Sequence, residues 1–234
     1  MPLFGARWLS YDTHMRWTIP NTLTVLRLLA APALAIVFVS VARPWADWLA
    51  LVLFVSAAAT DWLDGRLARA WGMESKFGAM LDPIADKAMV IIALAVLIGL
   101  LGPNFWIMVP AALILFREAF VSGLREFLGD TAGTLKVTTL AKWKTTVQMV
   151  AIAVLFSRGL FEHYFGMWTY GMGPDLVAQL LEGSVEDPLG LQQIYSGFRY
   201  SHYSGLVLIW LAAALTLITG ADYFRKAWPY VKDG

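Results

Sequence analysis

Four aspartates lie close together in the first half of the chain, within two strongly apolar segments. Asp61 and Asp64 are three residues apart, and Asp82 and Asp86 are four apart, so each pair shares one face of a helix. A charged aspartate at mid-membrane costs about 2.5 to 3.5 kcal/mol, and repulsion between the acids adds to that cost. One or two divalent cations would offset it, and all-oxygen ligands favour Mg²⁺, with Mn²⁺ or Ca²⁺ as alternatives. The spacing therefore predicts a metal site.

Small residues share the helix faces of these acids. Gly65 and Ala68 each follow an acid of the first pair by four residues, and Gly78 comes one turn before Asp82. They leave room for a bulky group to approach the backbone. Pro83 predicts either a kinked helix or a helix that Asp82 caps. A polar network between helices, or a pathway for cations or protons, is the alternative. Four acids with small residues between them favour metal ions that receive an anionic diphosphate.

The composition indicates a membrane protein. Of 234 residues, 59% are hydrophobic and 11 are tryptophan, and the mean hydropathy is +0.61. The absence of cysteine excludes disulfides, thiolate metal sites and a cysteine nucleophile, and a net charge of +1 gives no reason to expect nucleic acid as a partner. We expect an all-α polytopic membrane protein with a single domain, 1–234. Six transmembrane helices are predicted, at about 21–42, 46–70, 76–101, 105–128, 136–161 and 201–226.

Charge predicts how this domain sits in the membrane. Residues 1–18 mix tryptophan and arginine, which is typical of a helix in the membrane interface, with a basic unstructured tail as the alternative. Residues 163–200 are expected to form a non-cytoplasmic loop insert, with room for a short helix after Pro174. Lysine and arginine are in excess on the side of both termini and the aspartates, and acids predominate in 163–200. The positive-inside rule places the termini and the aspartates on the cytoplasmic side.

The aspartate motif resembles the signature of a known family. The pattern D-x2-D-G-x2-A-R-x8-G-x3-D-x3-D of the CDP-alcohol phosphatidyltransferase family is filled at every fixed position by Asp61, Asp64, Gly65, Ala68, Arg69, Gly78, Asp82 and Asp86. The resemblance covers about 19–157 and, loosely, the last span. It implies a six-helix architecture, a cytoplasmic active site, a homodimer and, for a bacterial member, a location in the inner (cytoplasmic) membrane.

Other segments are similar to the branch of this family that makes phosphatidylglycerophosphate. They are residues 19–24 with Arg27, 77–87, 117–118 with 124–126, and 142–145 with Gln148. Ala141 stands where that branch commonly has glycine, and 163–200 is longer than expected. The resemblance implies transfer of a phosphatidyl group from CDP-diacylglycerol to sn-glycerol 3-phosphate, releasing CMP. A sister transferase that accepts inositol phosphate, serine or phosphatidylglycerol is the first alternative, and a cation transporter the remote one.

The same resemblance assigns roles to individual residues. Metal, as two Mg²⁺ ions or Mn²⁺, is expected at Asp61, Asp64, Asp82 and Asp86, and Asp86 is also the expected general base. CDP-diacylglycerol is expected at Asn21, Thr24, Asp61, Gly65, Ala68, Arg69 and Gly78. The acceptor phosphate needs cations, and the candidates for that pocket are Arg117, Arg125, Lys142, Lys144 and Thr145. Alternatively, these basic residues set the topology or bind anionic lipid head groups. Glu118 is expected to orient Arg125 or Lys142.

Overall fold

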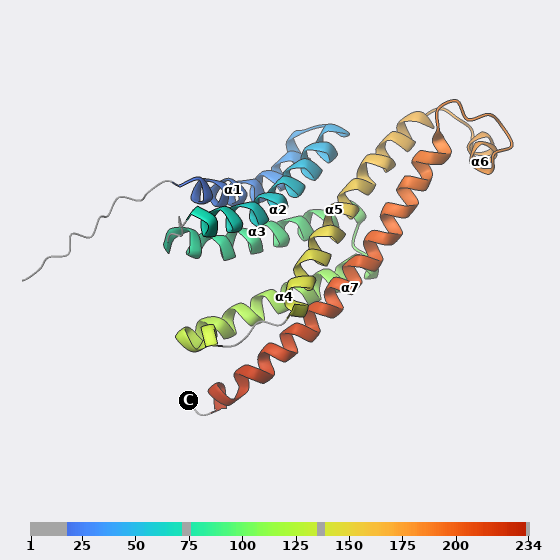
Figure 1. The fold of residues 1–234 in the computed structure, drawn as a ribbon. Helices are drawn as coiled ribbons and strands as arrows, with labels where there is room; N and C mark the ends of the chain where they lie inside the picture. Colours follow the sequence, from blue (N-terminus) through green and yellow to red (C-terminus); the bar gives the residue numbers. More distant parts are fainter. Residues whose placement is uncertain (1–17, 72–75, 135–138, 233–234) are drawn as a thin grey trace, which may run out of the picture.

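The computed structural model describes residues 18–71, 76–134 and 139–232, and their fold is shown in Figure 1. Within these ranges the chain forms seven α-helices and one short 3₁₀ helix, and it contains no strand. The helices are α1 (Ile19–Ser40), α2 (Trp45–Trp71), α3 (Lys76–Leu101), α4 (Phe105–Leu128), the 3₁₀ helix η1 (Gly129–Thr134), α5 (Thr139–Trp168), α6 (Pro174–Glu182) and α7 (Leu191–Lys232). The expected all-α fold is confirmed.

Five helices of the described part are long and apolar enough to cross a membrane. The segments are Asn21–Ser40, Phe77–Leu101, Phe105–Leu128, Trp143–Trp168 and Leu191–Lys232. The chain is therefore a polytopic membrane protein. The remaining expected span, 46–70, coincides with α2, whose side chains from residue 62 onward lie outside the description. The proposed interfacial segment lies outside it as well, apart from Thr18, which caps α1.

The segment 163–200 is largely helical, in contrast to the expected loop. α5 continues through Trp168, α6 forms the short helix after Gly173, and α7 already begins at Leu191. α7 has 42 residues, which corresponds to about 63 Å at 1.5 Å per residue. A hydrocarbon core is about 30 Å thick, so part of α7 extends beyond it.

Asp187, which lies just before α7, accepts hydrogen bonds from two backbone amides at the start of that helix. Its Oδ1 accepts from Leu191 N and its Oδ2 from Gln192 N, each at 2.9 Å. The first backbone amides of a helix have no partner within the helix, so a carboxylate there accepts their hydrogen bonds. Its negative charge also interacts favourably with the positive end of the helix dipole. The bonds from Gln192 and Leu191 lower the pKa of Asp187 below its ordinary value.

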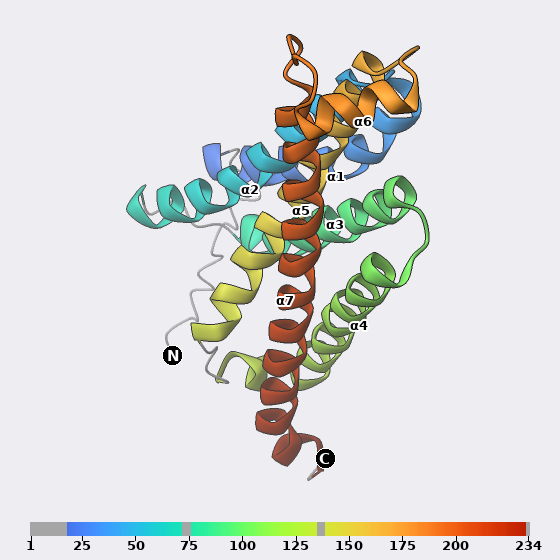
Figure 2. The same ribbon diagram turned by 90° about the vertical axis from the view of Figure 1, so that its right-hand side faces the viewer.

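The helices form two groups that meet along α5. α1 packs against α2 and α3, whereas α7 packs against α4 and along α5, and α5 also contacts α2 and α3. Figures 1 and 2 show that six helix ends lie toward the same end of the molecule. They are the starts of α1, α3 and α5 and the ends of α2, α4 and α7. The turns between α1 and α2 and between α3 and α4, together with α6, lie toward the other end.

Small residues allow the helices to approach closely in the core. Without a hydrophobic driving force in lipid, helix pairs depend on close van der Waals packing. Gly205 on α7 illustrates this, because a Cβ added there would lie 2.6 Å from Leu155 Cδ2 on α5. The buried core is rich in alanine and includes Ala31, Ala50, Ala57, Ala93, Ala111, Ala151, Ala212 and Ala213 between larger residues such as Phe54, Met89, Leu94 and Ile152.

An ion pair fixes the turn between α1 and α2. Arg43 donates from Nε and Nη2 to the two carboxylate oxygens of Asp47, at 2.7 and 3.0 Å, and from Nη2 to the Gly159 carbonyl of α5 at 3.0 Å. The Asp47 side chain is only 1% exposed, and its hydrogen bond raises the pKa of Arg43 against the opposing effect of burial. This contact ties the α1–α2 turn to α5.

Candidate active site

One arginine joins two of the four motif aspartates. Arg27 Nη1 on α1 donates to Asp61 Oδ1 on α2 and to Asp86 Oδ1 on α3, each at 2.8 Å. The Arg27 side chain is 1% exposed, and the two carboxylate side chains are 42% and 46% exposed. A buried cation therefore holds two acids of different helices together, while the acids themselves remain open to solvent or ligand.

A second contact from α1 positions a third aspartate. Thr24 Oγ1 donates to Asp82 Oδ1 at 2.6 Å. Thr24 and Arg27 are three residues apart, so both reach α3 from one face of α1. α3 runs from Lys76 through Pro83, so Asp82 does not cap a helix that starts at Pro83. Both acids of the second pair are carried by one helix.

The acids that the structure describes fit a hard divalent cation in their chemistry. Among the described side chains, which omit Asp64, no group of three or more acids or histidines is gathered closely enough to hold a metal ion. The oxygens of Asp61 and Asp86 nevertheless converge on a single positively charged nitrogen. Carboxylate oxygens that already share one cation supply the donor type that Mg²⁺ prefers.

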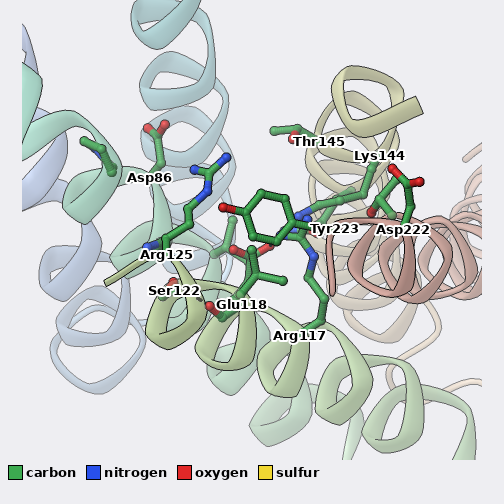
Figure 3. Close-up of a pocket in the computed structure, with 15 residues that line it drawn as sticks. Asp86, Arg117, Glu118, Ser122, Arg125, Lys144, Thr145, Asp222 and Tyr223 are labelled. Atoms are coloured by element: carbon green, nitrogen blue, oxygen red, sulfur yellow. Dashed lines mark hydrogen bonds and ion pairs between the residues drawn. The ribbon is translucent and has the colours of Figure 1, made fainter. Parts of the chain in front are cut away.

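Beside this acidic cluster lies a cavity of about 300 Å³. Figure 3 shows it between α3, α4, α5 and α7. Its charged and polar lining combines Asp86 and Lys87 of α3 with Arg117, Glu118, Ser122 and Arg125 of α4, Lys144, Thr145 and Gln148 of α5, and Thr219, Asp222 and Tyr223 of α7. Asp86 thus belongs both to the acidic cluster and to the wall of the cavity.

Glu118 organises two of the cations in the cavity wall. Its Oε1 accepts from Lys144 Nζ of α5 and from Arg117 Nη1 at 3.3 Å. Lys144 is buried. Gly220 of α7 lets Arg117 pack closely, since an added Cβ would lie 2.9 Å from Arg117 Cγ. The arrangement holds two cations beside one carboxylate, and a dianionic phosphate is the natural ligand for the remaining positive charge.

Comparison with known proteins identifies the family. The family model for CDP-alcohol phosphatidyltransferases matches residues 17–174. The chain belongs to the CDP-alcohol phosphatidyltransferase family. Three relatives are each named CDP-diacylglycerol–glycerol-3-phosphate 3-phosphatidyltransferase. The Cereibacter sphaeroides protein is 59% identical, over 94% of this chain and 99% of its own. The Rickettsia bellii protein is 36% identical, over 91% and 96%. The Salmonella choleraesuis protein is 40% identical, over 65% and 85%.

Within this family member, the structure groups the expected site residues into the two clusters just described. The acidic cluster contains Asp61, Asp82, Asp86 and Thr24, with the buried Asn21 three residues before Thr24 on α1 and the buried Gly78 four residues before Asp82 on α3. The cavity contains Arg117, Arg125, Lys144 and Thr145. The side chains of the remaining expected residues, Asp64, Ala68, Arg69 and Lys142, lie outside the described ones, as does the local environment of Gly65.

The structure adds residues to which the sequence analysis gave no role. Arg27, a buried cation of α1, donates hydrogen bonds to both Asp61 and Asp86. Its signal in the sequence was a lone arginine inside an apolar span, because such a charge needs a partner. The described partners of Glu118 are Lys144 and Arg117 and do not include Arg125, whereas Lys142, the other expected partner, lies outside the described side chains. The α7 wall had no comparable signal, since only packing brings α7 beside α4.

Proposed function

We propose that the chain transfers the phosphatidyl group of CDP-diacylglycerol to sn-glycerol 3-phosphate, giving phosphatidylglycerophosphate and CMP. The observation that carries this proposal is the cavity in which Asp86 faces Arg117, Arg125 and Lys144. Cations for an acceptor phosphate and a carboxylate for an acceptor hydroxyl thus line the same space. The names of the relatives from Cereibacter, Rickettsia and Salmonella support the same reaction.

The acidic cluster is proposed to hold the donor through divalent metal. Asp61, Asp64, Asp82 and Asp86 are the ligands that would hold Mg²⁺, with Mn²⁺ as the alternative. When bound, such ions neutralise the diphosphate of CDP-diacylglycerol and stabilise charge on the departing CMP. Arg27 keeps Asp61 and Asp86 oriented toward each other. Asn21 and Thr24 line the α1 side for the nucleotide, with Arg69, Gly65, Ala68 and Gly78 as the further expected contacts.

The cavity residues are proposed to act on the acceptor. Arg117, Arg125 and Lys144 bind its phosphate, and Lys142 and Thr145 are the further expected contacts. Asp86 takes the proton of the C1 hydroxyl as that oxygen forms a bond to the phosphatidyl phosphorus. The bond from this phosphorus to CMP breaks at the same centre. Positioning of both substrates against Asp86 then supplies much of the acceleration.

The membrane arrangement follows from the same proposal. We infer that α2 is a sixth span, that both termini and the active site face the cytoplasm, and that the membrane is a bacterial cytoplasmic membrane, as in the bacterial relatives. The charges near the two ends of α7 support this orientation. Its C-terminal end carries Arg225, Lys226 and Lys232, whereas the acids Glu182 and Glu186 precede its N-terminal end. Homodimerisation is the remaining expectation from the family, and the mass of the protein in lipid nanodiscs tests it.

CMP release by the purified protein tests the reaction. CDP-diacylglycerol in mixed micelles with Mg²⁺ is offered with glycerol 3-phosphate, inositol phosphate, serine or phosphatidylglycerol as separate acceptors. Release that depends on glycerol 3-phosphate alone is expected. Release with another acceptor instead would assign the chain to a sister activity, and no release together with metal flux into liposomes would indicate a transporter.

Two variants and a chelator test the assigned roles. Asp86→Asn is expected to abolish CMP release while CDP-diacylglycerol still binds, and Asp175→Asn, on the exposed surface of α6, is the matched control. Normal turnover by Asp86→Asn would exclude Asp86 as the base. Removal of divalent ions with EDTA is expected to stop the reaction, and added Mg²⁺ to restore it. Full activity after chelation would contradict the metal proposal.

A further inference from the structure

α7 contributes to the cavity wall a tyrosine whose hydroxyl has no hydrogen-bond partner among the described residues. Tyr223 is 7% exposed, it lines the cavity, and its hydroxyl is a buried polar atom that has no hydrogen-bond partner among the described residues. Burying a hydroxyl without a partner is unfavourable, and such groups in native proteins are few. A polar ligand in the cavity would supply the missing partner.

Two other helices that line the same cavity, α4 and α5, also carry a buried polar atom without a hydrogen-bond partner among the described residues. Arg117 Nε and Gln148 Oε1 are also buried and lack a hydrogen-bond partner within the described part of the chain. Both residues line the cavity, from α4 and α5 respectively. Three different helices therefore place around a single space hydrogen-bonding groups that have no partner among the described residues, which is the pattern expected of a site built for a small polar molecule.

The position of the Tyr223 ring indicates which part of the ligand it meets. The guanidinium carbon of Arg125 lies 5.3 Å from the ring centroid, within the range of a cation–π contact. Figure 3 shows the ring lying across the cavity, with its hydroxyl directed to the side of Arg125 and Asp86, while Arg117 and Lys144 lie on the other side. The phenol therefore lies among the cations that are proposed to bind phosphate, and a phenol O–H donates well to an anion.

We propose that Tyr223 is a specificity-determining residue, whose hydroxyl donates a hydrogen bond to the phosphate of glycerol 3-phosphate while its ring aligns Arg125. This inference rests on the proposed function and extends it, because it names a residue of α7 that distinguishes a phosphorylated acceptor from a plain polyol. Hydrogen bonds to a charged group contribute more than neutral ones, so removal of the hydroxyl alone should be measurable.

Tyr223→Phe isolates the hydroxyl because phenylalanine keeps the ring and its contact with Arg125. The KM for glycerol 3-phosphate should rise about tenfold or more, with kcat and the KM for CDP-diacylglycerol close to those of the wild type. Inorganic phosphate, used as a competitive inhibitor of the acceptor, should inhibit the variant about tenfold more weakly. Tyr230→Phe is the matched control, since Tyr230 is also on α7 but is 51% exposed.

Thermal unfolding separates this role from a structural one. Because the hydroxyl has no partner in the described structure, Tyr223→Phe should unfold at or above the wild-type temperature without ligand, and phosphate should stabilise it less. Lower stability with equal increases in both KM values would show a structural role and overturn the proposal. So would unchanged inhibition by phosphate. If the wild type itself fails to use glycerol 3-phosphate, the proposed function fails, whereas an active wild type with an indistinguishable Tyr223→Phe refutes only this inference.

Discussion

Arg27 offers the sharpest test of how the acidic cluster is held together. Arg27→Met keeps most of the side-chain volume but removes the donor that bonds Asp61 and Asp86 at 2.8 Å. A hydrogen bond to a charged group contributes about 1.5 to 3 kcal/mol. Both carboxylates are more than 40% exposed, so solvent screening places each bond at the low end of that range. The two together give about 3 kcal/mol.

Thermal unfolding in detergent, with and without Mg²⁺, measures this effect. At about 2 to 4 °C per kcal/mol for a chain of this size, the midpoint should fall by about 6 to 12 °C in the absence of divalent ions. Mg²⁺ should stabilise Arg27→Met more than the wild type, because the ion supplies the positive charge that the variant lacks. Arg27→Lys should recover part of the loss, since one ammonium donates to both acids.

A matched surface change completes the test. Arg199→Met removes an exposed arginine from α7 and is expected to leave the midpoint and the response to Mg²⁺ unchanged. If Arg27→Met unfolds at the wild-type temperature and Mg²⁺ stabilises both proteins equally, then Arg27 does not couple the two acids, and the reasoning from this contact is refuted.

Three further changes probe other parts of the structure. Gly220→Val should displace Arg117, whose Cγ would lie 2.9 Å from an added Cβ, and steady-state kinetics should show a higher KM for glycerol 3-phosphate at little cost for CDP-diacylglycerol. Asp47→Ala removes the carboxylate that accepts two hydrogen bonds from Arg43 and should lower stability by about 2 kcal/mol, while CMP release per folded molecule is unchanged. The folded-state pKa of Asp187 is lowered, so its contribution is present above the ordinary carboxyl pKa and is lost as the pH falls through the lower folded-state value. Unfolding midpoints measured from pH 7 downward should therefore converge for the wild type and Asp187→Ala at the acidic end, and parallel curves would contradict this cap.

The local features of the site were predictable from the sequence because helical spacing fixes them. Two acids three or four residues apart share a helix face whatever the surrounding fold, and the apolar runs located the five spans found in the described part of the chain. The lone Arg27 carried a readable signal as well, but its partners lie 34 and 59 residues away. Which acid a buried cation meets depends on how α1 packs against α2 and α3.

The features that were missed depend on packing between distant helices. Glu118 was expected to orient Arg125 or Lys142, yet it accepts a hydrogen bond from Lys144, 26 residues away. The α7 wall of the cavity depends on Gly220, which lets that helix approach Arg117. The extent of α5 and α7 was underestimated because hydropathy marks where a helix leaves lipid and not where its backbone hydrogen bonds end.

The place of Asp86 in both clusters has a thermodynamic consequence. An anion entering the cavity is repelled by this carboxylate, and a divalent cation bound there, as proposed, would reduce that repulsion. Metal should therefore raise the affinity for the acceptor, and the acceptor must raise the affinity for metal by the same factor, because binding free energies are reciprocal. A charge shared by two ligands makes each an effector of the other without any movement of the helices.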